Sequence, residues 1–176
     1  DDIQRSAATS VNDVLKLVSG VDVRQRGGFG VQTDISINGG TFDQITILLN
    51  GVNISNPQTG HNAADFPVSL SDIDRIEVLE GASARVFGAS AFSGAINIVT
   101  KTEAQSGLRL SADGGSFGTF GGSVALSLAS KTVRQQLSGG YSQSDGGTIN
   151  TYFRKRQGFY QGNFETKAID LFWQAG

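Results

Sequence analysis

The sequence predicts a small α+β unit, a short mixed sheet with one or two helices, followed by a run of antiparallel β-strands. Up to residue 101, apolar residues recur once at helical spacing and then in short strand-like runs separated by Gly, Asn and Asp. From residue 107 onward, apolar and polar residues alternate, and helical spacing does not return. The two parts of the chain therefore have different architectures.

The first expected element is a helix over residues 10–20. Ser10 and Asp13 have the spacing of a capping box, with Asp in place of the usual Glu. Four apolar residues follow on one helical stripe. They are Val11, Val14, Leu15 and Val18. Gly20 suits the left-handed position that ends many helices.

Short strands are expected next, in five places. They cover residues 21–24, 35–37, 45–49, 76–79 and 95–100. The third is almost wholly apolar, which predicts a strand buried on both faces, and Asn50-Gly51 after it is a hairpin-turn signal. A short helical turn is expected over 70–75, with Phe87 and Phe92 as apolar anchors of the small-residue stretch that follows.

Residues 107–176 predict strands with one apolar and one polar face. The alternating apolar positions include Leu108, Leu110, Val124, Leu126, Leu128, Val133, Leu137, Ile169, Leu171 and Trp173. Segments of about ten residues between short turns are typical of outer-membrane β-barrels. They are equally typical of a soluble antiparallel sheet. Because the alternation runs on to the last residue, we expect further strands beyond it.

The composition excludes several classes of site. The chain has no Cys and a single His, so disulfides and His-rich metal centres are not expected. A net charge of −2 and a pI near 5.3 do not suit a nucleic-acid partner. Asp72 and Asp74 have a spacing common on surfaces, and no nucleophile–base pair accompanies them. We therefore expect no catalytic site, no metal site and no cofactor.

Four segments, in this order, resemble the plug domain of TonB-dependent outer-membrane receptors. They are 34–39 (DISING), 45–52 (ITILLNGV), 73–81 (IDRIEVLEG) and 87–101 (FGASAFSGAINIVTK). The last two resemble the family segments IERIEVLRG and YGSGAFGGVINIITK. Asn38 and Glu80 replace usual basic residues, Ala82 replaces a usual Pro, and Phe87 stands where Tyr is common. Residues 56–62 (NPQTGHN) further resemble the vitamin B12 receptor branch.

The resemblance implies a transporter and not an enzyme. Residues 1–103 would be the plug, and residues 104–176 the first strands of an incomplete transmembrane β-barrel in a Gram-negative outer membrane. The cargo would be a scarce nutrient, with a corrinoid favoured and a siderophore or glycan as alternatives. The implied partners are outer-membrane lipid, a surface lipoprotein, and TonB, which would contact a segment before residue 1.

The resemblance also places ligand binding on apical loops. The candidates in this sequence are Gly28, Phe29, Asn53, Asn56, Gln58, His61 and Asn62. The amides and the low charge of this set suit an uncharged polar ligand, and His61 lacks the partners that a metal ion needs. The alternative is that these are turn residues that satisfy their own backbone.

Three charged residues are candidates for ion pairs between plug and barrel: Arg75, Glu77 and Glu80. Arg75 and Glu77 lie on one side of a strand because they are two residues apart. The alternative is a solvated sheet face. For the chain as a whole, the alternative to a transporter is a secreted or surface β-rich binding module.

Overall fold

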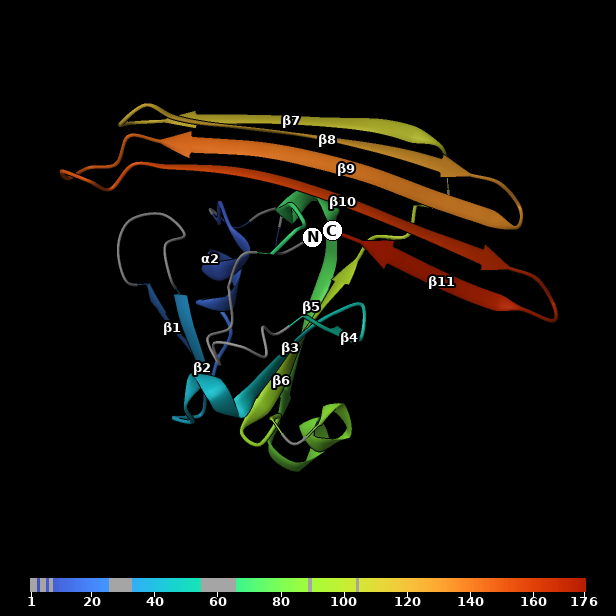
Figure 1. Cartoon of the computed structure of the whole chain (residues 1–176), viewed down its shortest axis with the longest axis horizontal. Helices are drawn as coiled ribbons and strands as arrows, with labels where there is room; N and C mark the ends of the chain where they lie inside the picture. Colours follow the sequence, from blue (N-terminus) through green and yellow to red (C-terminus); the bar gives the residue numbers. More distant parts are fainter. Residues whose placement is uncertain are drawn as a thin grey trace. The chain divides into compact units, whose positions relative to one another are not determined.

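The fold is given by a computed structural model, which describes residues 3, 6, 8–25, 33–54, 66–88, 90–103 and 105–176. The chain forms two compact units (Figure 1). The mixed-sheet unit comprises Asp1–Phe66 and Ile73–Thr100, and the strand-sheet unit comprises Pro67–Asp72 and Lys101–Gly176. The predicted fold class is confirmed: an α+β unit precedes a purely antiparallel sheet.

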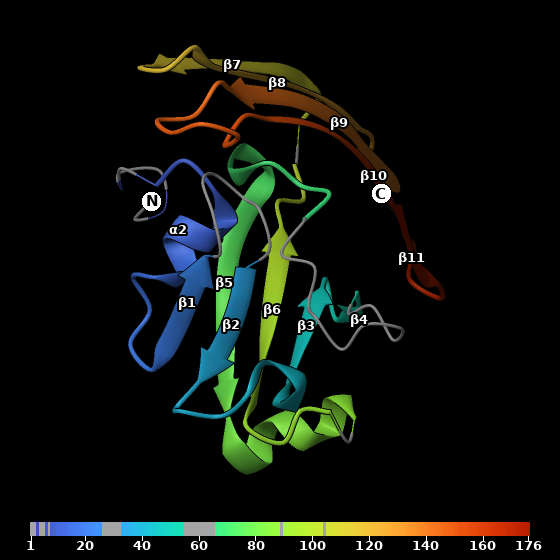
Figure 2. The ribbon, with the colours of Figure 1, turned by 60° about the vertical axis from the view of Figure 1, so that its left-hand side comes forward.

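The mixed-sheet unit is built on four strands. Their order is β4 (Val52–Asn53), β3 (Ile45–Leu49), β6 (Gly94–Thr100) and β5 (Ile73–Glu80). β3 runs parallel to β6, and the other pairs are antiparallel (Figure 2). All five residues of β3 are buried, as its apolar run predicts.

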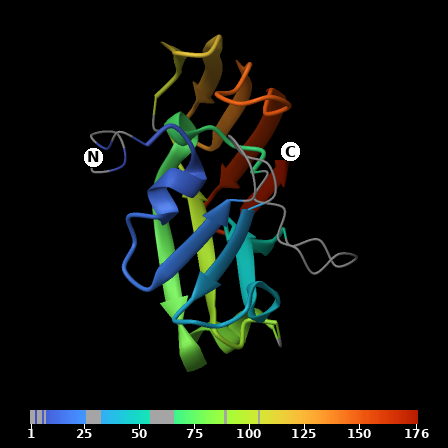
Figure 3. The same ribbon diagram turned by 90° about the vertical axis from the view of Figure 1, so that its left-hand side faces the viewer.

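A two-stranded hairpin and a short helix complete this unit. The hairpin pairs β1 (Val21–Gln25) with β2 (Thr33–Ile37), and it lies over one face of the four-stranded sheet (Figure 3). The helix α2 covers only Val11–Leu15, so the prediction of a helix reaching Gly20 is wrong. Ser10 caps it as expected. After Leu15, however, the backbone up to Val21 forms turns closed by hydrogen bonds between residues three apart.

The predicted turn after β3 is confirmed, but only one of the two predicted apolar anchors is. Asn50 and Gly51 take φ angles of 51° and 81° and join Leu49 directly to Val52, as the hairpin signal predicts. Phe87, in the 3₁₀ helix η3 (Gly81–Phe87), packs on the core, whereas Phe92 is 59% exposed. The prediction of Phe92 as an apolar anchor is therefore wrong, because the neighbouring Ala91 takes the buried position.

The strand-sheet unit is a five-stranded antiparallel sheet in sequence order, long and curved in Figure 1. Its strands are β7 (Gly107–Gly115), β8 (Thr119–Ala129), β9 (Val133–Ser144), β10 (Phe153–Glu165) and β11 (Asp170–Ala175). Among the described residues, no helix has the length and apolarity that a membrane crossing requires.

The register sorts the side chains of this sheet into two faces of opposite polarity. One cross-strand row reads Leu108, Leu126, Leu137, Tyr160 and Ala175. Leucines on this apolar face are exposed, with Leu110 at 71% and Leu137 at 57%. The alternate residues form the polar face, and its buried members include Gln136, Ser138 and Gln161. This distribution is the reverse of that in a water-soluble sheet, where the apolar face is covered.

Candidate functional site on the polar face of the strand sheet

A six-residue segment, Pro67–Asp72, belongs to the strand-sheet unit although the chain on both sides of it belongs to the mixed-sheet unit. We call it the anchor segment. It ends in the 3₁₀ helix η2 (Leu70–Asp72), whose turn is closed by the Asp72 amide donating to the Ser69 carbonyl at 2.9 Å. Val68 in this segment is buried. The segment is therefore a packed part of the strand-sheet unit.

Asp72 is the most buried polar residue of the anchor segment, with 0% of its surface exposed. Its Oδ2 accepts from the Ser69 amide at 3.3 Å, and its Oδ1 accepts from Gln136 Nε2, also at 3.3 Å. Its backbone carbonyl accepts from the Lys101 amide at 2.8 Å. Burying a carboxyl group without such donors would be costly, so these contacts hold Asp72 in one position.

Two glutamines of adjacent strands extend this network. Gln161 in β10 lies directly opposite Gln136 in β9. Gln161 Nε2 donates to Gln136 Oε1 at 3.2 Å and to the Lys101 carbonyl at 2.7 Å. Gln136 donates to Asp72, and Gln161 donates both to Gln136 and to the Lys101 carbonyl. Asp72 and Lys101 are therefore bound to the same pair of strands.

The two serines of the anchor segment add further contacts. Ser69 Oγ accepts from Gln157 Nε2 at 2.6 Å. The Ser71 carbonyl accepts from Lys101 Nζ at 2.9 Å and from Arg109 Nη1 at 3.2 Å. Period two places the donors from β7, β9 and β10 on the same face of the sheet. Ser123 of β8 also contacts the segment, with its Oγ 3.4 Å from Ser71 Oγ. Four different strands therefore hold the segment.

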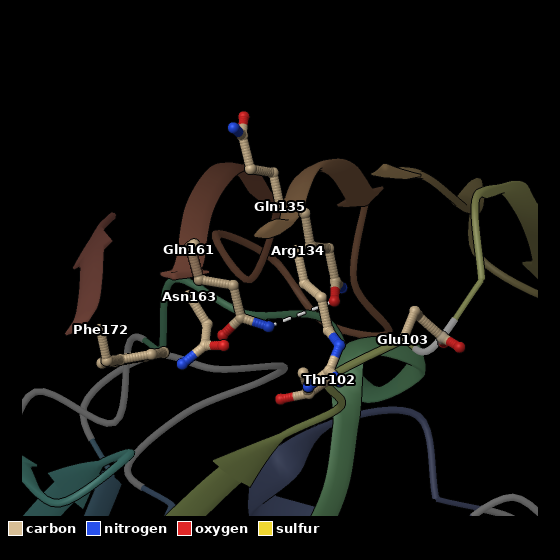
Figure 4. Close-up of a pocket in the computed structure, with 9 residues that line it drawn as sticks. Thr102, Glu103, Arg134, Gln135, Gln161, Asn163 and Phe172 are labelled. Carbon is tan, nitrogen blue, oxygen red and sulfur yellow. Dashed lines mark hydrogen bonds between the residues drawn. The ribbon is translucent and has the colours of Figure 1, made fainter. Parts of the chain in front are cut away.

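A small hollow lined mainly by polar residues lies beside this network (Figure 4). Its lining residues are Thr102, Glu103, Arg134, Gln135, Gln136, Gln161, Gly162, Asn163 and Phe172. Figure 4 shows Gln161 and Asn163 on the polar side of the sheet and Gln135 pointing away from it. Arg134 pairs with Glu165 at 3.4 Å, so a local acid partner already balances its charge.

The site is built from hydrogen-bonding groups. Across the described residues, no group of three or more His, Cys, Asp or Glu could hold a metal ion. The amides, hydroxyls and backbone carbonyls of the polar face can position a chain segment or retain water.

A second polar cluster lies on β5 and β6 of the mixed-sheet unit. Arg75 Nε donates to Glu77 Oε1 at 2.8 Å, and Arg75 Nη1 contacts Asp74 at 3.0 Å. Glu77 also accepts from its cross-strand partner, as Asn97 Nδ2 lies 2.9 Å from Glu77 Oε2. Glu80 accepts instead from Asn38 Nδ2 at 2.9 Å.

These contacts shift the pKa values of Arg75 and Glu77. The hydrogen bond from Asn97, and then that from Arg75, lowers the pKa of Glu77 below its usual 4.5. Hydrogen bonds to Asp74 and then to Glu77 raise the pKa of Arg75. Period two thus brings Arg75 and Glu77 together. Their pairing with the barrel, like that of Glu80, stays a prediction.

Most of the ligand-binding candidates lie outside the described residues: Gly28, Phe29, Asn56, Gln58, His61 and Asn62. Asn53 is described, and it lies exposed at the end of β4 opposite Leu48. Sequence reasoning missed Gln136, Gln157 and Gln161. The alternating polar residues of 107–176 could have pointed to them. That pattern does not show that they bind the anchor segment.

Residues 1–95 match the sequence profile of the TonB-dependent receptor plug domain family. Three solved structures resemble the chain: the copper transporter OprC (22% identity, TM-score 0.73, 90% of this chain and 26% of that one), the siderophore receptor PirA from Pseudomonas aeruginosa (21%, 0.70, 94% and 30%), and the FrpB iron transporter from Neisseria meningitidis (17%, 0.74, 92% and 28%). At these identities the likeness shows the fold. The chain spans less than a third of each of these structures.

Proposed function

Since this chain belongs to the TonB-dependent receptor plug domain family, we propose that it forms the plug and first wall strands of a nutrient transporter in a Gram-negative outer membrane. Residues 1–103 form the plug, and residues 104–176 begin the barrel wall. The transporter binds a scarce nutrient at the outer surface and gates its uptake into the periplasm. TonB supplies the energy by pulling on a segment before residue 1, and a surface lipoprotein assists capture.

The observation that carries this proposal is the polarity of the strand sheet. Its exposed face carries leucines, whereas its polar face carries buried amides and hydroxyls. An outer-membrane wall needs this arrangement, because lipid contacts one face and a plugged lumen lies on the other. A secreted binding module would expose the leucines to water, which counts against that alternative.

The anchor segment is the fixed point of the gate. It lies inside the stretch that matches the plug profile, yet four wall strands hold it through hydrogen bonds. A pull from TonB therefore rearranges the mixed-sheet unit, while Pro67–Asp72 stays on the wall. The chain leaves the mixed-sheet unit after Phe66 and re-enters it at Ile73, so the anchor segment connects two parts of that unit.

The β5 charges take part in the same movement. Arg75 and Glu77 pair with each other at 2.8 Å, and both are solvent-accessible. If one of these residues, or Glu80, forms an ion pair with the barrel, it gives up a contact with its present neighbour as well as with water. Such an exchange changes little in free energy, because accessible ion pairs are typically worth about 0–1 kcal/mol. A low-cost exchange of partners suits an interface that has to slide.

The cargo is a small nutrient bound by the apical loops. The candidates remain Gly28, Phe29, Asn53, Asn56, Gln58, His61 and Asn62. A corrinoid is supported by the resemblance of residues 56–62 to the vitamin B12 receptor branch. An iron–siderophore complex is supported by the names of two of the similar structures, a siderophore receptor and an iron transporter.

Calorimetry on the full-length receptor in detergent tests the cargo. Cyanocobalamin and a ferric siderophore are titrated separately into the native receptor and into a variant with residues 53–62 replaced by Gly and Ser. A matched control replaces the β9–β10 connection, residues 145–152, in the same way.

Binding of one ligand that is lost only with the 53–62 replacement supports both the transporter and its plug site. Loss with the 145–152 replacement alone moves the site to the barrel. A folded receptor that binds neither ligand contradicts the corrinoid and siderophore assignments.

A further inference from the structure

The apolar face of the strand sheet carries two charged residues, and both are arginines. Residues 107–176 are fully described, so the register assigns every strand residue to a face. On the apolar face, the charged residues of β7–β11 are Arg154 and Arg156, both exposed. Every Asp and Glu of these strands lies on the polar face. The pair therefore makes a positive patch that no acidic residue of its own face balances.

The two arginines lie at one end of the apolar band. The row of Arg156 continues through Tyr141, and the row of Arg154 continues through Gln143 and Phe120. At the other end of β10, Phe164 faces the same side, eight residues further along the strand from Arg156. Eight residues span about 26 Å along a strand, or about 20 Å along the axis of a barrel whose strands tilt by 40°. The arginines are thus placed at headgroup depth and not beside lipid tails.

The connections between strands indicate which membrane surface this is. β9 and β10 are joined at the arginine end by residues 145–152, the longest connection of the sheet. At the opposite end, the connections after β8 and β10 are residues 130–132 and 166–169. Outer-membrane barrels have short periplasmic turns and longer loops outside. Arg154 and Arg156 therefore face the outer leaflet.

Phosphate is the headgroup chemistry that this pair fits. Two residues two apart on one strand face lie about 6.6 Å apart along the backbone. Each guanidinium presents a planar fork that binds phosphate with two parallel hydrogen bonds. The cross-strand neighbours are already occupied, because Tyr141 Oη donates to Gln143 Oε1 at 2.6 Å. No described carboxylate forms an ion pair with either arginine.

We propose that Arg154 and Arg156 form a docking surface for the phosphorylated headgroup of an outer-leaflet lipid. The proposal rests on the placement of β7–β11 in an outer-membrane wall. It does not depend on which nutrient is transported. Bound lipid would fix the height of β10 in the membrane next to the longest connection of the sheet.

Native mass spectrometry of the full-length receptor in a zwitterionic detergent tests this docking surface. The probes are diphosphorylated lipid A, the same lipid without phosphates, and inorganic phosphate alone. The test variant is R154Q/R156Q. The matched control is K131Q/K167Q, which removes the same charge from the two turns at the other end of the sheet. We expect the test variant to lose roughly tenfold in lipid A affinity and the control to bind as the native receptor does.

Equal binding of the dephosphorylated lipid, or unchanged binding by R154Q/R156Q, would overturn the proposal. Displacement of lipid A by millimolar inorganic phosphate would also overturn it, since the site would then be a phosphate site and not a lipid-docking surface. A second variant, R154K/R156K, guards against misfolding of the first: it keeps the charge but lacks the forks, so we expect partial loss. Nutrient binding by the same samples is read separately, so failure of the lipid site and failure of the transporter assignment remain distinguishable.

Discussion

Truncating Gln136 to Ala should loosen the anchor segment on the polar face of the strand sheet. Gln136 Nε2 is the donor to Asp72 Oδ1, at 3.3 Å, and Asp72 is fully buried. Leaving a buried acceptor without its donor costs about 1–3 kcal/mol. Asp72 keeps its contact with the Ser69 amide, and Gln161 keeps its contact with the Lys101 carbonyl. The effect should therefore be local loosening and not collapse of the sheet.

Hydrogen exchange of the full-length receptor measures this loosening. A cost of 1–3 kcal/mol corresponds to about 5- to 150-fold faster exchange of the Asp72 amide. Gln135→Ala is the matched control, because Gln135 is the sequence neighbour whose side chain points to the opposite side of the sheet in Figure 4. Unchanged exchange over residues 67–72 in Gln136→Ala, or an equal change in Gln135→Ala, would refute the anchor.

Three further predictions concern other parts of the chain. Because the folded pKa of Glu77 is depressed, its contribution to stability is complete above pH 4.5 and is lost as the pH falls through the folded value. Glu77→Gln should therefore weaken the loss of stability at acid pH, measured as the free energy of unfolding across a pH titration. Gly94→Ala should destabilise the mixed-sheet unit by about 1–3 kcal/mol, measured by thermal unfolding, because the new Cβ would lie 2.7 Å from both Ile37 Cδ1 and the Leu79 carbonyl oxygen. Leu126→Arg should cost about 2–4 kcal/mol in lipid vesicles, measured by urea unfolding.

Each of these predictions has its own control. If Glu77→Gln loses as much stability at acid pH as the native protein does, another group causes that loss. Gly107→Ala meets no atom within 4 Å, so it should leave the unfolding temperature unchanged. Leu126→Ala removes apolar contact without adding charge. If Leu126→Arg costs no more than Leu126→Ala, the apolar face does not lie against lipid.

Local signals predicted the elements of the mixed-sheet unit well. The apolar run at 45–49 became the fully buried β3, and Asn50-Gly51 became the tight turn after it. Such signals act through backbone geometry and through neighbours a few residues away. They failed at α2, which ends at Leu15 although the apolar stripe runs on to Val18. A five-residue helix derives its stability mainly from what it packs against, and spacing alone does not report that.

Period two in the sequence by itself determined that residues 107–176 form strands with unlike faces, and that Arg75 and Glu77 share one side of β5. Tertiary structure decided which face is covered and by what. Asp72 and Gln136 are 64 residues apart, and no local pattern connects them. The physical reason is that a buried carboxyl group needs donors from whichever strands fold over it. Those donors are brought together by the register of the sheet and not by proximity in the chain.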